Sequence, residues 1–184
     1  MQIFKDFPIT TEEYELLEKQ FGNLCEYAAW EYYKRNVMNN HINEQSDFSQ
    51  ELRAIMITAG SYYKRQNYIE NCLNLCKEYV KDEFMARIVE ELCKLWKNKT
   101  KHGANKQKFG PHQENLLEVL TNEHVPSDLV PDKKAPLEID TKFENYCKYI
   151  IWNKGKEMGR KITKERAISQ GLVSLSDYEY LAEI

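Results

Sequence analysis

The sequence predicts an all-α protein, because turn-forming residues are few and apolar residues recur at helical spacing. Only 7 Gly and 5 Pro occur among 184 residues. Hydrophobic residues make up 42% and charged residues 30%, a balance typical of a globular chain and unlike that of a disordered one. Apolar residues repeat every three or four positions over most of the chain, which places them on one helix face. We therefore expect a compact multi-helix domain.

The first helix should begin near Thr10. Thr10 and Glu13 have the spacing of a capping box, and Ile9 and Tyr14 occupy the positions of a hydrophobic staple. An apolar stripe follows at helical spacing: Leu17, Phe21, Leu24, Ala28 and Tyr32. Residues 37–46 interrupt this pattern and indicate a loop.

A second helix should start at Ser46 or Asp47, because Asp47 and Gln50 form another capping signal. Asn67 could end it. Its apolar stripe is Phe48, Leu52, Ile55, Ala59 and Tyr63. Two further helical patterns follow, one carrying Ile69, Cys72, Leu73, Cys76 and Val80, the other Phe84, Ile88, Leu92 and Leu95.

The middle of the chain should contain less helix. Residues 97–110 are polar and basic and contain two glycines, which predicts a loop. Pro111 suits the first turn of a short helix that carries Leu116, Leu117 and Leu120. Residues 123–139 hold three of the five prolines and indicate a linker or an ordered loop.

A further helix should start at Asp140 or Thr141, with Thr141 and Glu144 as a third capping box. Its stripe would comprise Phe143, Tyr146 or Cys147, Ile150 and Ile151. Two glycines weaken its far end: Gly155 and Gly159. A last short helix is expected over Ser176–Ala182.

The cysteines and the apolar segments indicate a cytoplasmic protein. The five cysteines are odd in number, and most lie on apolar helical stripes, as buried free thiols do in a reducing compartment. The N-terminal segment has no apolar signal-peptide core, and no stretch approaches 18 apolar residues. We expect no membrane association.

Charge is distributed unevenly although the net charge is only −3. Six lysines and no acid occur between Lys94 and Lys108. Six basic residues and two acids, Glu157 and Glu165, occur between Lys154 and Arg166. Such runs can bind phosphate through release of counterions. Trp96 and Phe109 stand at the edges of the basic loop 97–108 and could stack on bases. Alternatively, Trp96 could lie in the core beside a solvated loop.

No enzyme signature is present, since the chain lacks a phosphate-binding loop, a dinucleotide fingerprint and a nucleophile elbow. Cys72 and Cys76 share a helix face, but that face is apolar, and a zinc site needs about four convergent ligands. The histidines of the middle segment, His102, His112 and His124, match no metal-binding spacing together with Cys93. We therefore expect no catalytic residue, no cofactor and no metal.

Two segments resemble region 2 of bacterial sigma factors, the domain that binds the polymerase clamp and opens the minus-ten promoter element. The first is Asp47-Phe48-Ser49-Gln50-Glu51, followed by LRAIMITAGSYY. It is similar to the family's Asp-Leu-x-Gln-Glu stretch, which opens a helix. Phe48 replaces the leucine, and Ala59 and Tyr63 lie in register with the family's alanine and aromatic positions.

The second segment runs from Lys142 to Asn153, with Phe143, Tyr146 and Tyr149 in a Phe-x-x-Tyr-x-x-aromatic pattern. A basic stretch, GRKITKER, and a Ser-Leu pair follow in the order found in the family. Where the family usually has tandem tryptophans, this chain has Tyr149 and Ile150.

The resemblance implies a sigma-like factor, as in phage-encoded late sigma factors, acting in the host cytoplasm if the chain is viral. Its partners would be core RNA polymerase, promoter DNA and a possible coactivator, because no helix-turn-helix follows. The expected polymerase-binding residues are Asp47, Gln50 and Glu51. The expected DNA-binding residues are Tyr146, Tyr149, Trp152, Asn153, Lys154, Lys156, Arg160, Lys161 and Lys164.

The two segments are about 75 residues apart, which implies an insertion. We expect a sigma-like helical domain from residues 1–65 and 140–184, and a helical insertion over residues 66–139 with the basic loop and the proline-containing linker. Two alternatives remain open. One is a phage structural, packaging or polymerase-binding regulatory protein without promoter readout. The other is a metal-dependent enzyme built on the middle segment.

Overall fold

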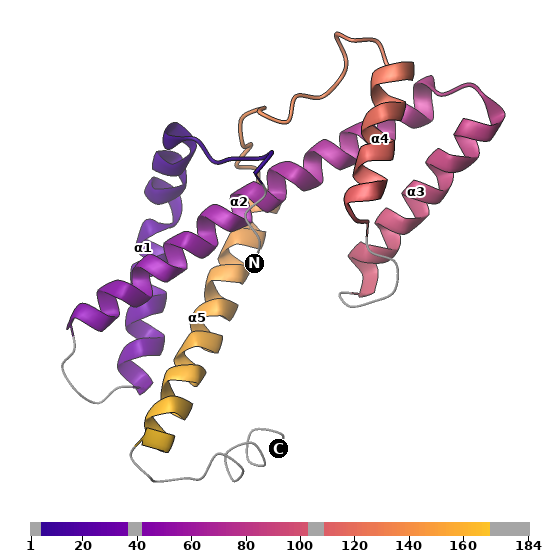
Figure 1. The fold of residues 1–184 in the computed structure, drawn as a ribbon. Coiled ribbons are helices and arrows are strands. Elements are labelled where there is room, and N and C mark those ends of the chain that lie inside the picture. Colours follow the sequence, from indigo (N-terminus) through magenta and orange to yellow (C-terminus); the bar gives the residue numbers. More distant parts are fainter. Residues whose placement is uncertain (1–4, 37–41, 103–108, 170–184) are drawn as a thin grey trace. The chain divides into compact units, whose positions relative to one another are not determined.

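A computed structural model of the chain describes residues 5–36, 42–102 and 109–169. These residues form helices and no strand, which confirms the all-α prediction. The helices are α1 (Thr11–Asn36), α2 (Ile42–Tyr79), α3 (Glu83–His102), α4 (Pro111–His124) and α5 (Thr141–Ser169) (Figure 1). Within this part of the chain, no helix has the length and apolar character of a membrane span. The short helix expected at 176–182 lies outside the described residues.

The chain divides into two compact units. Among the described residues, the α1–α5 unit contains those of 8–61 and 137–169, and so holds α1, the first part of α2 and α5. The α3–α4 unit contains Lys5–Phe7 and Tyr62–Pro136. The sigma-like nature of the first part and the insertion character of the second remain predictions.

Helix α1 begins with the expected capping box. The backbone N–H of Thr10 donates to Glu13 Oε2 at 2.7 Å, and the N–H of Glu13 donates to Thr10 Oγ1 at 3.3 Å. The other carboxylate oxygen of Glu13 accepts from the backbone N–H of Leu137 at 2.7 Å. One buried carboxylate therefore caps α1 and holds the chain where it returns to the α1–α5 unit.

Helix α2 is longer than predicted at both ends. It begins at Ile42, so Asp47 lies inside the helix and does not open it. The helix also runs through Asn67 to Tyr79. The predicted start at Ser46 or Asp47 is therefore wrong. The predicted end at Asn67 is also wrong, because Asn67 weakens a helix only slightly. Its neighbour Ile69 is buried in the core of the α3–α4 unit, and that packing outweighs the local preference.

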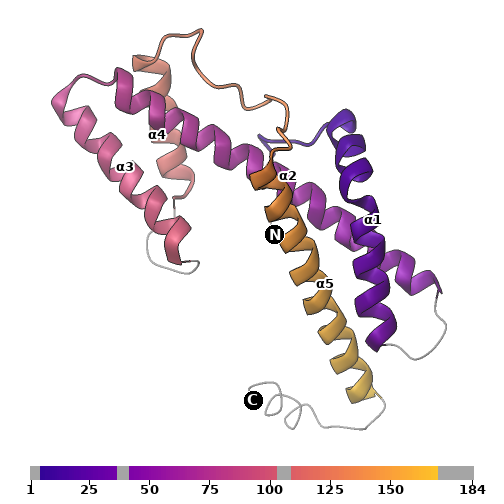
Figure 2. The same ribbon diagram turned by 180° about the vertical axis from the view of Figure 1, so that it is seen from behind.

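Apolar residues of three helix segments form the core of the α1–α5 unit, and α1 and α5 lie side by side along their length (Figures 1 and 2). Phe21 of α1 and Phe143 of α5 meet edge to face, with ring centroids 6.1 Å apart. The other fully buried residues include Leu17, Cys25, Ala28, Leu52, Met56, Ala59, Cys147 and Ile151.

Two glycines allow close approach in this core. A Cβ atom on Gly155 would lie 3.0 Å from Tyr32 Cδ2, so α1 and α5 can pack this closely only without a side chain there. A Cβ atom on Gly60 would lie 3.0 Å from Ile9 Cδ1 and 3.3 Å from Leu137 Cδ2. Gly155 was expected to weaken the helix, but α5 continues beyond it to Ser169 because packing compensates for its low helix propensity.

An ion-pair network joins α1 to α2 within the same unit. The guanidinium of Arg53 contacts Glu18 Oε1 and Glu26 Oε1, each at 2.8 Å. Ser49 Oγ donates to Glu26 Oε1 at 2.8 Å. The hydrogen bond from Ser49, assisted by Arg53, lowers the pKa of Glu26. One arginine of α2 therefore pairs with two acids of α1.

The N-terminal cap of α5 differs from the predicted one. The backbone N–H of Phe143 donates to Asp140 Oδ1 at 2.7 Å, so Asp140 is the capping residue. The predicted box of Thr141 and Glu144 is wrong, because Thr141 is already helical and Glu144 pairs instead with Lys148 at 2.5 Å.

The α3–α4 unit packs the end of α2, α3 and α4 around a second core. Helix α4 starts at Pro111 as predicted, and the N–H of Gly110 donates to Gln113 Oε1 at 2.9 Å. The proline-containing segment is an ordered loop held by Lys133, whose Nζ contacts Glu118 Oε2 at 2.8 Å and lies 5.7 Å from the ring centre of Tyr68.

Helix α3 corrects the prediction of a loop over residues 97–110. The helix extends to His102, past the predicted end near Trp96. Lysines have good helix propensity, and the run from residue 97 contains no glycine or proline before Gly103. The first part of the basic run therefore continues the helix that the apolar stripe begins.

All five cysteines are buried and free, as expected. Burial raises the pKa of the Cys25 thiol to about 11 and that of Cys147 to about 12. Both thiols stay protonated and unreactive near neutral pH, since the thiolate is the nucleophile.

Replacing Cys147 with alanine should reduce the alkaline loss of stability. Because its folded pKa lies above the ordinary thiol value of 9.0, the stabilisation is present below that value and is lost as the pH rises toward about 12. Between about pH 8 and pH 10 the wild type should lose free energy of unfolding. The loss in Cys147→Ala should be smaller by about 1 kcal/mol. Urea unfolding at both pH values measures this. Equal losses of stability in the variant and the wild type would show that burial does not raise the pKa of Cys147.

Candidate nucleic-acid interface on helix α5

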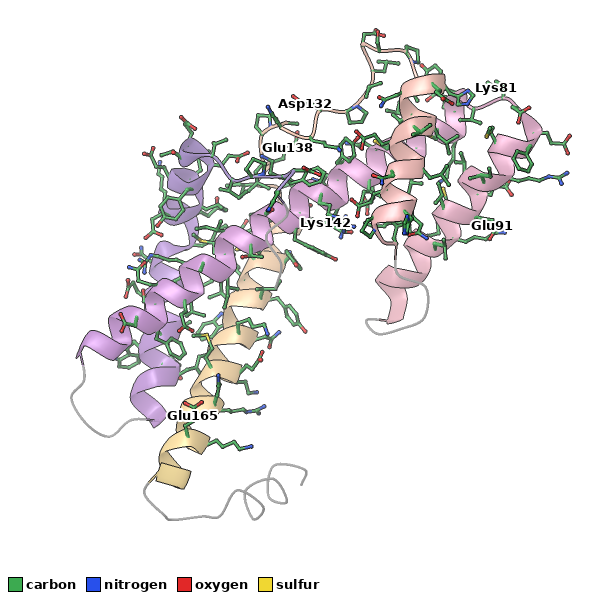
Figure 3. All side chains as sticks on the ribbon, viewed as in Figure 1. Lys81, Glu91, Asp132, Glu138, Lys142 and Glu165 are labelled. Atoms are coloured by element: carbon green, nitrogen blue, oxygen red, sulfur yellow. The ribbon has the colours of Figure 1, made fainter. Side chains whose placement is uncertain are left out.

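Helix α5 presents one continuous exposed stripe. Tyr149, Asn153, Lys156 and Arg160 are all exposed and follow one another at intervals of four, three and four residues, which places them on one helix face. Tyr149 is 68% exposed, although it is a large aromatic residue. Figure 3 shows the side chains along α5, with Lys142 near its start and Glu165 near its end. These four residues carry aromatic, amide and cationic groups, and the acid that borders them, Glu157, is paired with Lys154.

The opposite face of α5 fixes the orientation of the stripe. Phe143, Cys147 and Ile151 are fully buried against the rest of the α1–α5 unit. Because these residues recur every four positions, the helix cannot rotate without exposing them. The stripe is therefore held toward solvent by core packing.

Two predicted phosphate-binding lysines lie off this stripe. Lys154 Nζ contacts Glu157 Oε2 at 2.6 Å, and Lys161 Nζ lies 3.9 Å from Glu165 Oε1. The hydrogen bond from Lys154 lowers the pKa of Glu157. Among the described residues, neither Lys156 nor Arg160 has such an acidic partner. The structure thus divides four of the five predicted cations into two paired lysines and two cations of the stripe, and the fifth, Lys164, is half-buried.

Three other predicted DNA-binding residues are only partly accessible. Trp152 is half-buried and packs edge to face against two tyrosines of α1, with centroids 5.8 Å from Tyr27 and 5.6 Å from Tyr32. Tyr146 and Lys164 are also half-buried and have contacts of their own. Trp152 therefore serves the α1–α5 packing and leaves less of its ring for a ligand than Tyr149 does.

Sequence reasoning missed two aromatic residues of α1. Tyr27 is 53% exposed and Trp30 is 42% exposed. Their rings stack with centroids 6.1 Å apart and planes inclined by 22°. A signal was available, because both residues lie outside the apolar stripe of α1 and are three positions apart on one face.

The predicted polymerase-binding residues form an exposed face of α2. Asp47, Gln50 and Glu51 are all exposed, and their spacing of three and four residues places them together. Phe48 and Leu52, on the other face of the same turns, are buried. Two carboxylates and an amide are therefore available to a partner although Asp47 does not cap the helix.

The two aromatic residues at the edges of the basic loop, Trp96 and Phe109, are not available for base stacking. Trp96 is buried and meets Phe109 edge to face, with centroids 5.2 Å apart. Neither ring can stack on a base without unfolding this contact. Of the two interpretations left open for Trp96, the core position holds. Residues 103–108 of the basic run lie outside the described residues.

The thiols of the α3–α4 unit serve packing. Cys72 and Cys76 belong to its apolar core, and Cys76 Sγ lies 3.3 Å from Thr121 Oγ1. In the part of the chain that the structure describes, no group of three or more His, Cys, Asp and Glu residues could hold a metal ion.

Comparison of the chain with protein-family models, curated proteins and solved structures finds no match. The resemblance to sigma region 2 therefore depends on the two motifs, and a functional proposal depends on the motifs together with the geometry of the α1–α5 unit.

Proposed function

We propose that this chain is a sigma-like transcription initiation factor that binds core RNA polymerase and recognises and melts the minus-ten promoter element. The observation that carries the proposal is the exposed aromatic and cationic stripe of α5, with Tyr149, Asn153, Lys156 and Arg160. It coincides with the segment that resembles the DNA-opening part of sigma region 2.

The chemistry of the stripe suits unpaired DNA. Melting requires bases to leave the stack, which costs a few kcal/mol per base. An exposed tyrosine offers a face for a flipped base, and Asn153 offers a donor and an acceptor for a base edge. Lys156 and Arg160 lie one and two turns further along α5, where they can contact the phosphates of the same strand.

A second surface in the same unit suits a protein partner. The α2 face of Asp47, Gln50 and Glu51 carries negative charge and hydrogen-bonding groups. Such a face favours a basic surface on the polymerase clamp through electrostatic complementarity. Separate helices therefore carry the negative and the positive surfaces, so the factor can bind protein and DNA at once.

Replacing Asp47 and Glu51 with alanine should weaken capture of core polymerase by about tenfold, because two charge-assisted contacts are lost. A pull-down with purified bacterial core polymerase measures this. The matched control replaces Glu78 and Glu90, two exposed acids of the α3–α4 unit, and should leave capture unchanged.

The outcomes separate the candidate functions. Capture without opening of any promoter would favour a regulatory protein that occupies polymerase without reading DNA. Absence of capture by the wild type, together with a large oligomer in light scattering, would favour a structural or packaging protein.

A further inference from the structure

Helix α1 exposes two aromatic rings that the core does not use. Tyr27 and Trp30 stack on each other at 6.1 Å and remain about half exposed. The core of the unit instead takes Leu17, Phe21 and Ala28 from this helix. An exposed pair of large aromatic rings marks an interaction surface more often than an isolated apolar residue does.

We propose that Tyr27 and Trp30 form a second base-stacking surface for single-stranded DNA, continuous with the exposed stripe of α5. This inference rests on the proposed function and extends its binding surface from one helix to two. It assigns a ligand-binding role to residues that neither sequence motif includes.

Trp152 makes the two surfaces continuous. Its ring meets that of Tyr27 edge to face at 5.8 Å. On α5, Trp152 follows Tyr149 by three residues and precedes Asn153, so it borders the stripe. The aromatic side chains therefore follow one another from Trp30 through Tyr27 and Trp152 to Tyr149.

Charge around this surface favours a nucleic acid. Lys156 and Arg160 continue the stripe with positive charge. The acid that precedes Tyr27, Glu26, is held by Arg53 and Ser49. Glu31, one turn after Tyr27, is half-buried and engaged in an interaction of its own. Phosphates can therefore approach from the α5 side of the aromatic rings.

The aromatic faces favour a single strand over a duplex. Every base has a face that can stack on an aromatic ring, whatever its identity. In a duplex those faces are covered by neighbouring base pairs. A strand already opened on α5 could place its next bases on the α1 rings and so stay open.

The test uses the full chain and a fluorescently labelled oligonucleotide of thymidines, which cannot pair with itself. Anisotropy should show that the wild type binds this single strand more tightly than a duplex of the same length. Replacing Tyr27 and Trp30 with alanine should weaken single-strand binding about tenfold. The matched control replaces Phe84 and Leu129, exposed apolar residues of the α3–α4 unit, and should leave binding unchanged.

A second readout distinguishes stacking from loss of structure. Trp30→Phe keeps a flat ring and should retain most of the affinity. Of the three tryptophans, Trp96 is buried in the other unit, so oligonucleotide quenching of tryptophan fluorescence should come from Trp30 and Trp152. In Trp30→Phe this quenching should fall by about half. Far-UV circular dichroism should show unchanged helix in each variant.

Three results would overturn the inference. Unchanged single-strand affinity in Tyr27→Ala plus Trp30→Ala, with loss in Tyr149→Ala, would confine the site to α5 and leave the proposed function intact. Loss of polymerase capture with unchanged DNA affinity would make the α1 rings a protein-docking surface. If the wild type fails to bind the single strand, the stacking surface is wrong, and polymerase capture then decides the proposed function separately.

Discussion

Replacing both Tyr149 and Lys156 with alanine is expected to reduce promoter opening by about 10- to 100-fold while polymerase capture stays at the wild-type level. Tyr149 is 68% exposed and supplies no core packing. Loss of one base-stacking contact weakens binding by about 1–3 kcal/mol, and every 1.4 kcal/mol or so corresponds to a factor of ten. Loss of the phosphate contact from Lys156 adds to this and makes opening less sensitive to salt.

Permanganate reactivity of unpaired thymines on a promoter that the wild type opens would measure this effect. The matched control is Lys148→Ala, which removes an exposed lysine of the same helix that is paired with Glu144 off the stripe. This control should open the promoter normally. If Tyr149→Ala plus Lys156→Ala also opens it normally, the stripe is not the DNA-binding surface.

Phe143→Ala should lower the free energy of unfolding of the α1–α5 unit by about 3–5 kcal/mol, the usual range for a buried phenylalanine. The ring of Phe143 is fully buried and meets Phe21 edge to face. Its loss would leave a cavity between α1 and α5. Because the same contact orients the exposed stripe, DNA binding should weaken as the unit unfolds.

Urea unfolding followed by far-UV circular dichroism measures the change. Tyr149→Ala is the matched control, since it truncates a ring on the solvent face of the same helix and should change stability by less than about 0.5 kcal/mol. A loss below about 1 kcal/mol in Phe143→Ala would show that the two helices do not depend on this contact.

Local patterns predicted the helix starts that depend on local hydrogen bonds. The capping box of Thr10 and Glu13 and the Pro111 start of α4 are both present. At α5 the candidate start was right, but Asp140 took the capping role from Thr141. When two neighbouring residues can both cap, the geometry of the first turn selects one, and the sequence pattern does not show which.

Helix ends that depend on packing were not predictable in the same way. Asn67 and Gly155 both weaken a helix locally, yet α2 and α5 pass through them. The compensation comes from residues distant in sequence. For Gly155 it is the ring of Tyr32 on α1, which occupies the space that a side chain would fill.

The candidate site shows the same division. The sequence motif predicted nine DNA-binding residues on α5. The motif does not show which of these tyrosine, tryptophan and lysine side chains reach solvent. Tertiary contacts separate them, since Lys154 and Lys161 pair with acids and Trp152 packs on α1. The exposed rings of Tyr27 and Trp30 belong to no motif, and the contact of Tyr27 with Trp152 depends on the tertiary structure.

The sequence by itself determined the all-α class, the cap of α1, the Pro111 start of α4 and the buried thiols, because helical periodicity and capping are local properties of the chain. Only the tertiary structure decided which face of α5 meets solvent, where α2 begins and ends, and which aromatic rings remain accessible. Those properties depend on contacts between residues far apart in the chain, such as Phe21 with Phe143. No pattern within a single segment contains them.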